Sequence, residues 1–541
     1  WFRVLGLNLG ASTYAFTVML LAFLLGIAGG GAVGGRLGDR RLAVGGVPAV
    51  LHALAWTQGA VALATAVALY VSTQLPFVYV SLFDALRAVR DPTTLWTVKL
   101  LVAGLLLLPS TVAMGVAFPL AVRAAVGRPE AVGAAVGRVY AANTAGGVLG
   151  AALAGFLFLP VLGMRGTVAL SVAASVGGAL VALGGLPAFG RVPTRSTPFR
   201  GLVGGAGLLA ATWVVVPPTW DPLLVTSGMY KYASDLDELT ADGVVAYARE
   251  PYRLLFYAEG PATVVTAAQS RRTGNVWLAN NGKIDASTTG DMPTQTLVSV
   301  LPLMVADARD EVLMVGLASG ISAGAVLWFD DVGSMEVVEL EPATARAARL
   351  FESWNGGVLD DPRTTLVFDD GRNHLLRQRP GRYDVIVSEP SNPWITGVSN
   401  LFTAEFFTMA RTRLTPGGVW AQWVQLYGMD DDDVATLLGT FSDVFPHVEV
   451  WGAAEDADLV VLGSDRPIAP TWAQAEALFD RPPVADALSR IFIDTPGDLL
   501  AYRRLDDAAV RALSAEAPRN TDDNMRIEYR APRNLHKGTT I

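Results

Sequence analysis

The first 217 residues contain six stretches with no Asp, Glu, Lys or Arg, and these constrain the fold more than any other feature. They cover residues 11–35, 47–71, 100–120, 139–162, 167–189 and 201–216. Crossing a bilayer takes about 20 mostly apolar residues. A helix is suited to that environment because it satisfies its own backbone hydrogen bonds. The pattern therefore predicts a multi-span α-helical membrane domain rather than six buried helices of a water-soluble protein.

Composition agrees with this division and excludes several classes of function. Only 17% of the 541 residues are charged, against about 25% in ordinary soluble proteins, and the deficit falls within residues 1–217. The chain has no cysteine, which excludes disulfides and cysteine-ligated metal centres. A net charge of −9 argues against a nucleic-acid partner, since such domains usually present a basic face. We expect membrane lipid as a partner, with partner membrane subunits or a second copy of the chain as further candidates.

The cationic residues between the six stretches predict which way the membrane domain faces. Cytoplasmic loops of membrane proteins carry the excess of Lys and Arg. The gaps after the first, third and fifth stretches hold Arg36, Arg40, Arg41, Arg123, Arg128, Arg138, Arg191, Arg195 and Arg200, whereas the opposite gaps hold Arg87, Arg90, Lys99 and Arg165. We therefore expect a multi-pass protein of the cell (inner) membrane whose C-terminal half lies outside the cytoplasm. The alternative, a C-terminal half inside the cytoplasm, stays open. The sixth stretch gives only about 24 Å of helix at about 1.5 Å per residue, less than the roughly 30 Å hydrocarbon core of a bilayer.

After residue 217 the pattern becomes that of a water-soluble protein with sheets. Residues 252–258, 263–270 and 275–279 predict β-hairpins joined by Gly and Asn turns. From residue 311, apolar strands alternate with helical segments, which predicts a Rossmann-like α/β domain with a mostly parallel sheet. The expected strands are 311–316, 335–340, 364–368, 384–388 and 419–424. We divide the chain into a membrane domain at 1–217, a linker and small β domain at 218–310, and the α/β domain at 311–541.

Polar and glycine residues follow four of these strands, at the ends where such sheets bind ligands. A small-residue loop after the first strand suits close approach of a nucleoside to the backbone. An acid after the second can accept hydrogen bonds from ribose hydroxyls, and an acid after the third can accept from an adenine amino group. The fourth is followed by a Pro-restrained turn that presents an acid over the site. In strand order these residues are Gly316, Ser319 and Gly320, then Glu339, then Asp370 and Gly371, then Glu389.

With these residues in place, the chain resembles the spermidine synthase family in its membrane-fused form, over roughly residues 250–465. The segment Gly137-Arg-Val-Tyr-Ala-Ala-Asn-Thr-Ala-Gly146 and the tail Asn520-Thr-Asp-Asp-Asn524 are similar to those of the fused members. The resemblance implies a further helix before Trp1, and a donor of the S-adenosylmethionine class, often its decarboxylated form, with no metal. It implies that Glu339 holds the ribose, Asp370 the adenine, and Glu389 the proton of the attacking amine. Gln295 and Asn392 are expected on the substrate side.

Three positions depart from the family pattern. Ser319 stands where the family has an aspartate for the aminopropyl ammonium, Asn392 where it has a second catalytic acid, and Thr294 where it has a tyrosine. Groups that would hold cationic chains are thus neutral, so we expect weak or absent transfer of aminopropyl groups to putrescine. A ligand that retains its α-carboxylate would suit Ser319 better than an aspartate, because the repulsion disappears.

Four functions remain open at this point. We expect a membrane-anchored transferase that moves an aminopropyl or related alkyl group to an amine. A methyltransferase on the same scaffold is the nearest rival, and a non-catalytic accessory subunit with a decayed nucleotide domain comes next. A transporter is the fourth, because residues 34–41 resemble a loop of major facilitator transporters.

Other polar residues of the C-terminal half are expected to be structural. Asp residues at 430–433 predict the start of a helix, where acids favour the helix dipole, with a metal site as the alternative. His374 is expected at an exposed helix position. Trp394, Trp423 and Tyr427 fit either a pocket wall or the core.

Overall fold

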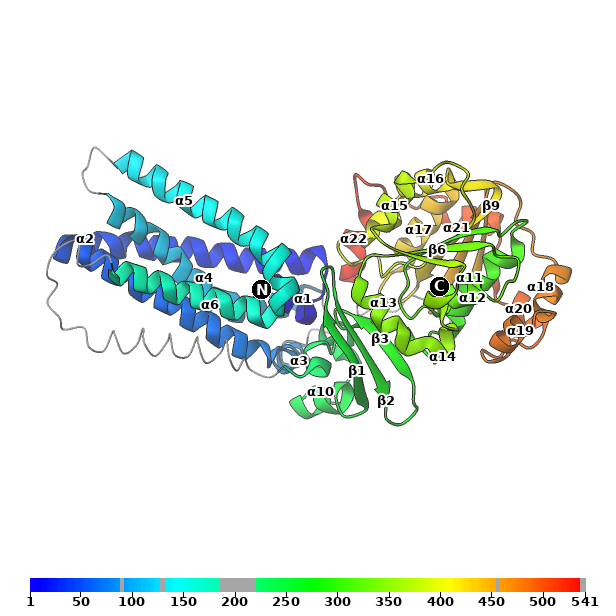
Figure 1. Cartoon of the computed structure of the whole chain (residues 1–541), viewed down its shortest axis with the longest axis horizontal. Helices are drawn as coiled ribbons and strands as arrows, with labels where there is room; N and C mark the ends of the chain where they lie inside the picture. The colour runs from blue at the N-terminus through cyan, green and yellow to red at the C-terminus, as the bar shows by residue number, and fades with distance from the viewer. Residues whose placement is uncertain (88–91, 127–131, 185–219, 454–456, 536–541) are drawn as a thin grey trace. The chain divides into compact units, whose positions relative to one another are not determined.

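The computed structural model describes residues 1–87, 92–126, 132–184, 220–453 and 457–535, and the predicted sixth span at 201–216 lies outside them. The chain divides into two compact units. The helical unit comprises Trp1–Leu9 and Ala15–Val245, and the α/β unit comprises Gly10–Tyr14 and Ala246–Ile541 (Figure 1).

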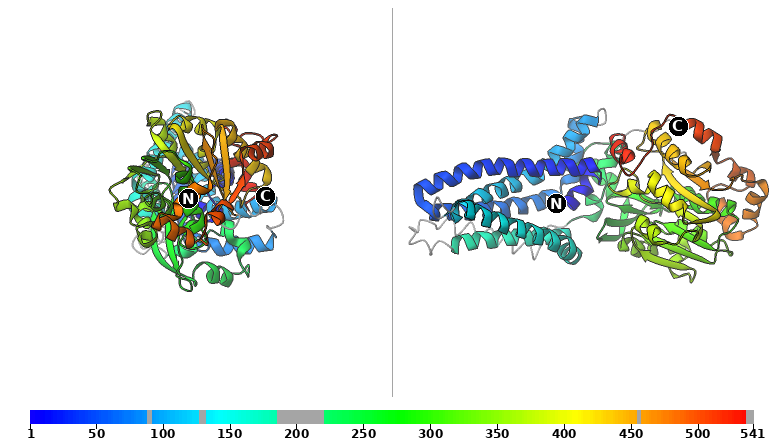
Figure 2. Two further views of the ribbon diagram at one scale, coloured as in Figure 1. Left: turned by 90° about the vertical axis from the view of Figure 1, so that its right-hand side faces the viewer. Right: turned by 90° about the horizontal axis from the view of Figure 1, so that it is seen from above.

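Long helices form the first unit, and Figure 2 shows them running alongside one another. Among the described residues, three helical stretches are long and apolar enough to cross a membrane. The first bends at Gly45 and Gly46, and the last bends at Gly163, so that each contains two of the predicted spans. Helix therefore covers five of the predicted spans from Thr13 onward, the last of them as far as Gly184. The elements are α2 (Thr13–Ser72), α4 (Pro92–Ala125), α5 (Val132–Leu153), the π-helical turn η3 (Ala154–Phe158) and α6 (Leu159–Gly184).

Glycine lets α2 and α4 approach closely. A Cβ placed on Gly30 would lie 2.0 Å from the Val112 carbonyl oxygen, and one on Gly115 would lie 2.4 Å from the Ile27 carbonyl oxygen. Small residues permit such contact between membrane helices, where van der Waals packing replaces the hydrophobic effect.

Short helices complete the helical unit. Four of them, α1, α3, α8 and α9, pack on one another around the fully buried ring of Tyr79. The elements are α1 (Phe2–Leu9), α3 (Leu75–Ala85), α8 (Pro222–Val225), α9 (Met229–Tyr232) and η5 (Ala233–Asp235), and α10 (Ala241–Ala248) spans the unit boundary.

The α/β unit begins with a four-stranded antiparallel sheet in the order β1-β2-β3-β4. The three predicted strands of this region are confirmed, and a fourth, β4, was not predicted. Its strands are β1 (Tyr252–Glu259), β2 (Val264–Ser270), β3 (Val276–Asn280) and β4 (Lys283–Ser287).

An eight-stranded sheet follows, in the order β12-β10-β11-β9-β8-β5-β6-β7. The predicted parallel sheet is confirmed for β5 to β9, and β10, β11 and β12 extend it with antiparallel pairs. The strands are β5 (Glu311–Val315), β6 (Ser334–Glu339), β7 (Thr364–Phe368), β8 (Tyr383–Ser388), β9 (Leu414–Gln425), β10 (His447–Gly452), β11 (Asp458–Ser464) and β12 (Arg503–Leu505).

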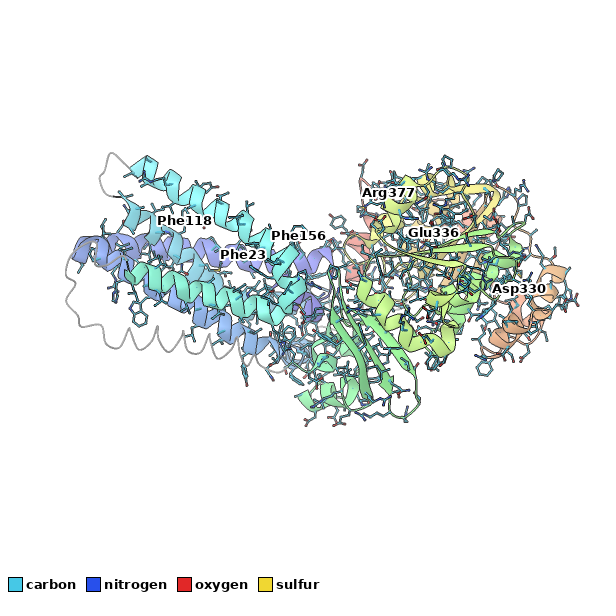
Figure 3. The ribbon with its side chains drawn as sticks, viewed as in Figure 1. Phe23, Phe118, Phe156, Asp330, Glu336 and Arg377 are labelled. Atoms are coloured by element: carbon cyan, nitrogen blue, oxygen red, sulfur yellow. The ribbon has the colours of Figure 1, made fainter. Side chains whose placement is uncertain are left out.

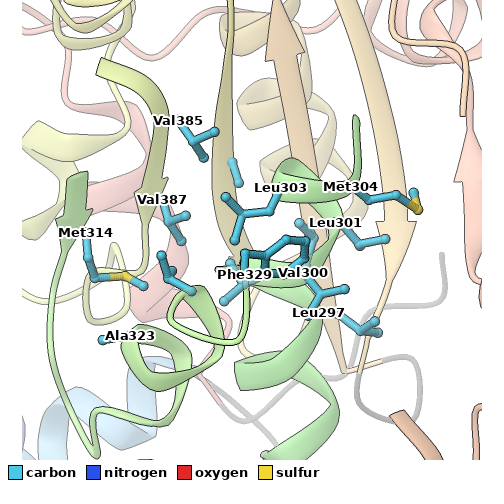
Figure 4. Packing of buried hydrophobic residues seen from close by; sticks show 14 of the residues in the cluster. Leu297, Val300, Leu301, Leu303, Met304, Met314, Ala323, Phe329, Val385 and Val387 are labelled. Atoms are coloured by element: carbon cyan, nitrogen blue, oxygen red, sulfur yellow. The ribbon is translucent and has the colours of Figure 1, made fainter. Parts of the chain in front are cut away.

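Helices cover this sheet and build the core. The apolar helix α11 (Met292–Val305) packs on β8, β9 and β11, and its Leu297 and Leu301 are fully buried (Figure 4). The remaining helices are α12 (Ile321–Val326), α13 (Pro342–Ala348), η6 (Arg349–Phe351), α14 (Glu352–Asn355), η7 (Val358–Asp360), α15 (Gly371–Arg377), η8 (Val398–Leu401), α16 (Ala404–Arg411), α17 (Asp431–Val444), α18 (Trp472–Phe479), α19 (Pro482–Ser489), α20 (Pro496–Leu500), α21 (Asp507–Ser514), α22 (Arg526–Arg530) and η10 (Ala531–Arg533).

One buried carboxylate ties the two sheets together. Glu341 caps α13 by accepting from the Ala343 N–H at 3.0 Å, and it also accepts from the N–H groups of Ala262 and Thr263 in the β1–β2 turn at 2.9 and 3.0 Å. A Cβ on Gly260 would lie 1.9 Å from the Glu341 carboxylate, so this turn requires glycine there.

Candidate active site

The strand ends predicted to meet do lie together at the carboxyl edge of the parallel sheet. The Glu389 N–H donates to the Val315 carbonyl at 2.9 Å, and the Leu317 N–H donates to the Glu339 carboxylate at 3.0 Å. A Cβ on Gly371 would lie 2.6 Å from the Val315 side chain. The loops after β5, β6, β7 and β8 therefore surround one place.

Gly316 is required by this convergence. Its φ is +98°, and a Cβ there would lie 2.4 Å from the Glu389 carbonyl oxygen. Any side chain would push the β5 and β8 ends apart, and the positive φ would be strained for other residues. The glycine thus sets how closely the loop after β5 approaches the turn that carries Glu389.

Glu339 is held with its carboxylate facing the loop after β5. It accepts from the Leu317 N–H and, at 2.8 Å, from the Glu341 N–H. Burial raises the pKa of Glu339 to about 7, and these backbone hydrogen bonds partly offset that rise. A half-buried carboxylate with fixed orientation suits recognition of paired hydroxyl groups.

Asp370 caps a helix. It is the N-cap of α15, and its side chain accepts from the Asn373 N–H at 2.8 Å. Its neighbour Asp369 is paired with Arg377. The capping bond fixes where the Asp370 carboxylate points, beside Gly371 at the strand edge.

The residues that depart from the family pattern, Ser319, Thr294 and Asn392, are buried, and each bonds to a different neighbour. Ser319 donates to the Gln295 side-chain oxygen and accepts from the Ile321 N–H at 3.2 Å. Gln295 also donates to the Ser287 carbonyl at 2.8 Å. Thr294 donates to Asp458 at 2.7 Å. Ser319 and Gln295 therefore support the loop after β5 from behind.

Glu389 lies among other acids. Burial raises its pKa to about 7, and the charges of Asp458, Asp291 and Asp285 add to the rise, whereas a bond from Ser322 opposes it. Like charges close together hold a proton or attract a cation. The surroundings of Glu389 therefore favour an ammonium group or a bound proton.

A lysine and two further acids at this place were missed from the sequence. Lys283 is 3% exposed, and its Nζ lies 2.9 Å from an Asp285 oxygen. Ser391 donates to the other Asp285 oxygen at 2.9 Å, which connects β4 to the turn after β8. Asp458 stands at the start of β11, and burial raises its pKa to about 6. Both β4 and β11 pair in antiparallel fashion and lie outside the predicted βα units. The alternation of polar and apolar residues in Lys-Ile-Asp of β4 was the sequence signal that could have indicated this strand.

Aromatic side chains border the same place. Asn392 donates to the Tyr427 hydroxyl at 3.4 Å, and the Tyr427 ring packs edge-on against Trp394 at 5.9 Å between centroids. Trp423 is buried within the large core cluster.

Two expectations for polar residues outside the site have opposite outcomes. The expected exposure of His374 is wrong: it is 5% exposed and bonds to Glu336 and Gln378 at 3.3 and 3.0 Å. This contact and others hold the pKa of Glu336 at about 2.

The predicted helix start at residues 430–433 is confirmed, because Asp430 and Asp433 form a capping box at α17.

Comparison with known proteins finds one family over part of the chain. The spermine/spermidine synthase domain model matches residues 292–453. Polyamine aminopropyltransferase 2 of Pseudomonas aeruginosa is 29% identical over 310 residues, which cover 56% of this chain and 85% of that protein. Putrescine N-methyltransferase 1 of Nicotiana tabacum is 28% identical over 174 residues, covering 32% and 46%. Spermidine synthase from Thermotoga maritima is a structural match at 19% identity with a TM-score of 0.39, covering 49% and 88%.

The family model and the named relatives confirm the resemblance to spermine/spermidine synthases, and with it the transferase class. The family model covers the part of the chain that holds Gly316, Glu339, Asp370 and Glu389.

The raised pKa of Glu389 predicts a stability difference that depends on pH. The folded protein holds this proton up to about pH 7, whereas the ordinary value is 4.5. The stabilisation is therefore complete below about pH 4.5 and is lost as pH rises through 7. Glu389→Gln should raise the thermal midpoint of the full chain in detergent at pH 8 and leave it nearly unchanged at pH 4.

The control is Glu476→Gln at an exposed position of α18, which should show no pH-dependent difference. Tryptophan fluorescence during heating measures both variants. An equal change in the Glu389→Gln midpoint at both pH values would contradict the burial of the charge.

Proposed function

We propose that this chain, whose residues 292–453 match a spermine/spermidine synthase domain, is a membrane-anchored transferase. It binds an S-adenosyl sulfonium donor and transfers an aminopropyl or related alkyl group to an amine. The observation that carries the proposal is the convergence of Glu339 and Glu389 on either side of the Gly316 loop.

Glu339 and Asp370 are assigned to the nucleoside of the donor. Glu339 presents a half-buried, oriented carboxylate suited to the two ribose hydroxyls, and Asp370 stands at the next strand end. The loop from Gly316 to Gly320 brings the backbone close to both. The sulfonium supplies an electron-poor carbon and a neutral leaving group.

Glu389 is assigned as the proton acceptor. A primary amine is protonated near neutral pH and must lose a proton before its nitrogen can attack carbon. A carboxylate with a pKa of about 7 is well matched to that task, because it is ionised in part at the working pH and is basic enough to take a proton. The acids around it attract the ammonium form of the acceptor.

Methyl transfer is the second candidate. It is supported by the match to putrescine N-methyltransferase 1 of Nicotiana tabacum at 28% identity. Mass spectrometry of products formed with S-adenosylmethionine and with its decarboxylated form distinguishes the two transfers. Absence of any product with either donor would favour the non-catalytic alternative.

Removal of the Glu339 carboxylate should weaken nucleoside binding. Hydrogen bonds to charged groups contribute about 1.5–3 kcal/mol each. Glu339→Ala should therefore weaken 5′-methylthioadenosine binding by roughly ten- to a hundredfold in calorimetry. Glu476→Ala serves as the exposed control. An unchanged dissociation constant in Glu339→Ala would remove Glu339 from the nucleoside site.

Loss of the Glu389 carboxylate should slow the chemical step and leave donor affinity almost unchanged. Removing a general base commonly costs about 10²–10⁴-fold in rate, so Glu389→Gln should fall in that range in single-turnover experiments. The wild-type rate should rise with pH through about 7 as Glu389 ionises, and the variant should lack that rise. Loss of donor binding with an unchanged single-turnover rate would contradict the assignment.

Membrane anchoring is proposed from the helical unit. Large apolar side chains of its long helices are exposed, such as Leu25 at 55%, Leu105 at 51% and Phe156 at 89% (Figure 3). Such a surface suits contact with lipid chains. With nine cationic residues on one set of gaps and four on the other, the α/β unit is assigned to the non-cytoplasmic side.

Single cysteines in this cysteine-free chain test the sidedness. Val44→Cys, at a position 88% exposed near the α2 bend, should be protected from an impermeant maleimide in intact cells. Ala508→Cys, at an exposed position of α21, should be labelled. The reverse pattern would place the α/β unit in the cytoplasm.

A further inference from the structure

Lys283 lies in a cage that has the chemistry of an ammonium-binding site. Its side chain is almost fully buried, with Nζ 2.9 Å from an Asp285 oxygen. The same Nζ is 5.8 Å from the centre of the Trp423 ring and 5.6 Å from that of Tyr427. Cations within about 6 Å of an aromatic face are attracted to it. One carboxylate and two rings therefore surround this ammonium.

This cage adjoins the acids around Glu389. Asp285, which pairs with Lys283, also accepts from Ser391 in the turn that carries Glu389. The charge of Asp285 acts on Glu389, and the charge of Lys283 acts on Asp458. The lysine therefore stands beside the place assigned to the reacting amine.

Several buried polar atoms without partners among the described residues gather at this place. Neither side-chain polar atom of Gln425, nor Asn392 Oδ1, nor Asp458 Oδ1, has a hydrogen-bond partner within the described ranges. Gln425 is fully buried and stands opposite Asp458 in the β9–β11 register, so that both side chains lie on one face. Leaving such atoms unsatisfied is costly, and a bound acceptor with polar groups would satisfy them.

We propose that Lys283 occupies the position in which the second ammonium of a diamine would bind, and so restricts the acceptor to amines with a single positive charge. A diamine that placed one ammonium at Glu389 would bring its other ammonium toward the lysine and be repelled. A monoamine, whose far end is uncharged and can meet Gln425 and Asn392, avoids that repulsion. The inference rests on the proposed transfer to an amine and assigns the substrate class of that site.

The test compares two acceptor probes of equal length, putrescine and 4-amino-1-butanol, in which a hydroxyl replaces one ammonium. Calorimetry on the full chain in detergent, saturated with 5′-methylthioadenosine, should show tighter binding of 4-amino-1-butanol to the wild type. Lys283→Met, which keeps length and removes charge, should raise putrescine affinity at least tenfold and change 4-amino-1-butanol affinity less than about threefold. Lys283→Arg retains a cation and should keep the wild-type preference.

Binding of 5′-methylthioadenosine reports that each variant is folded. Putrescine binding to the wild type at least as tightly as 4-amino-1-butanol would overturn the proposal without any variant. A ratio of the two affinities that Lys283→Met leaves unchanged would show the lysine to be only a structural partner of Asp285, which also overturns it. The comparison requires no turnover, so absence of product would count against the transferase proposal alone.

Discussion

The close approach of the β5 and β8 ends is the contact on which the rest of the site depends. Gly316 passes within reach of the Glu389 carbonyl oxygen, a distance that no other residue would allow. The Leu317 N–H that follows is thereby directed at Glu339, and the Glu389 N–H is directed at Val315. Two acids from different strands are positioned by backbone bonds and need no flexible side chain to bring them together.

Glu339 and Glu389 have different electrostatic surroundings. Glu339 has backbone donors for its carboxylate, whereas Glu389 has acids around it, and burial raises the pKa of both to about 7. One side of the site is therefore suited to hydroxyl groups and the other to an ammonium or a proton. Lys283 lies on the second side and offsets part of its negative charge.

Sequence patterns predicted the parallel part of the sheet because each βα unit repeats the same signal, an apolar strand followed by Gly or an acid. Gly316, Glu339, Asp370 and Glu389 were found in this way, and the structure brings them to one edge. The acids and lysine of β4 and β11 were not found, because antiparallel strands carry no such signal at their ends. Lys283 and Asp285 alternate like any half-exposed strand, and only their contacts with Trp423 of β9 and with the turn after β8 make them part of the site. His374 was expected outside for the same reason, since its burial comes from Glu336 and Tyr383 on other strands.

The hydrogen bonds of Glu341 to the β1–β2 turn also determine which turn can tolerate insertions and deletions. The turn is pinned by its Ala262 and Thr263 N–H groups and closed by Gly260. An inserted residue there would shift β2, and the ladder to β3 and β4 would carry the shift to Lys283. The β2–β3 turn at residues 271–274 is exposed and has no such anchor to the larger sheet among the described residues. Insertions and deletions between related chains should therefore accumulate at that far turn, where exposed loop tips tolerate them.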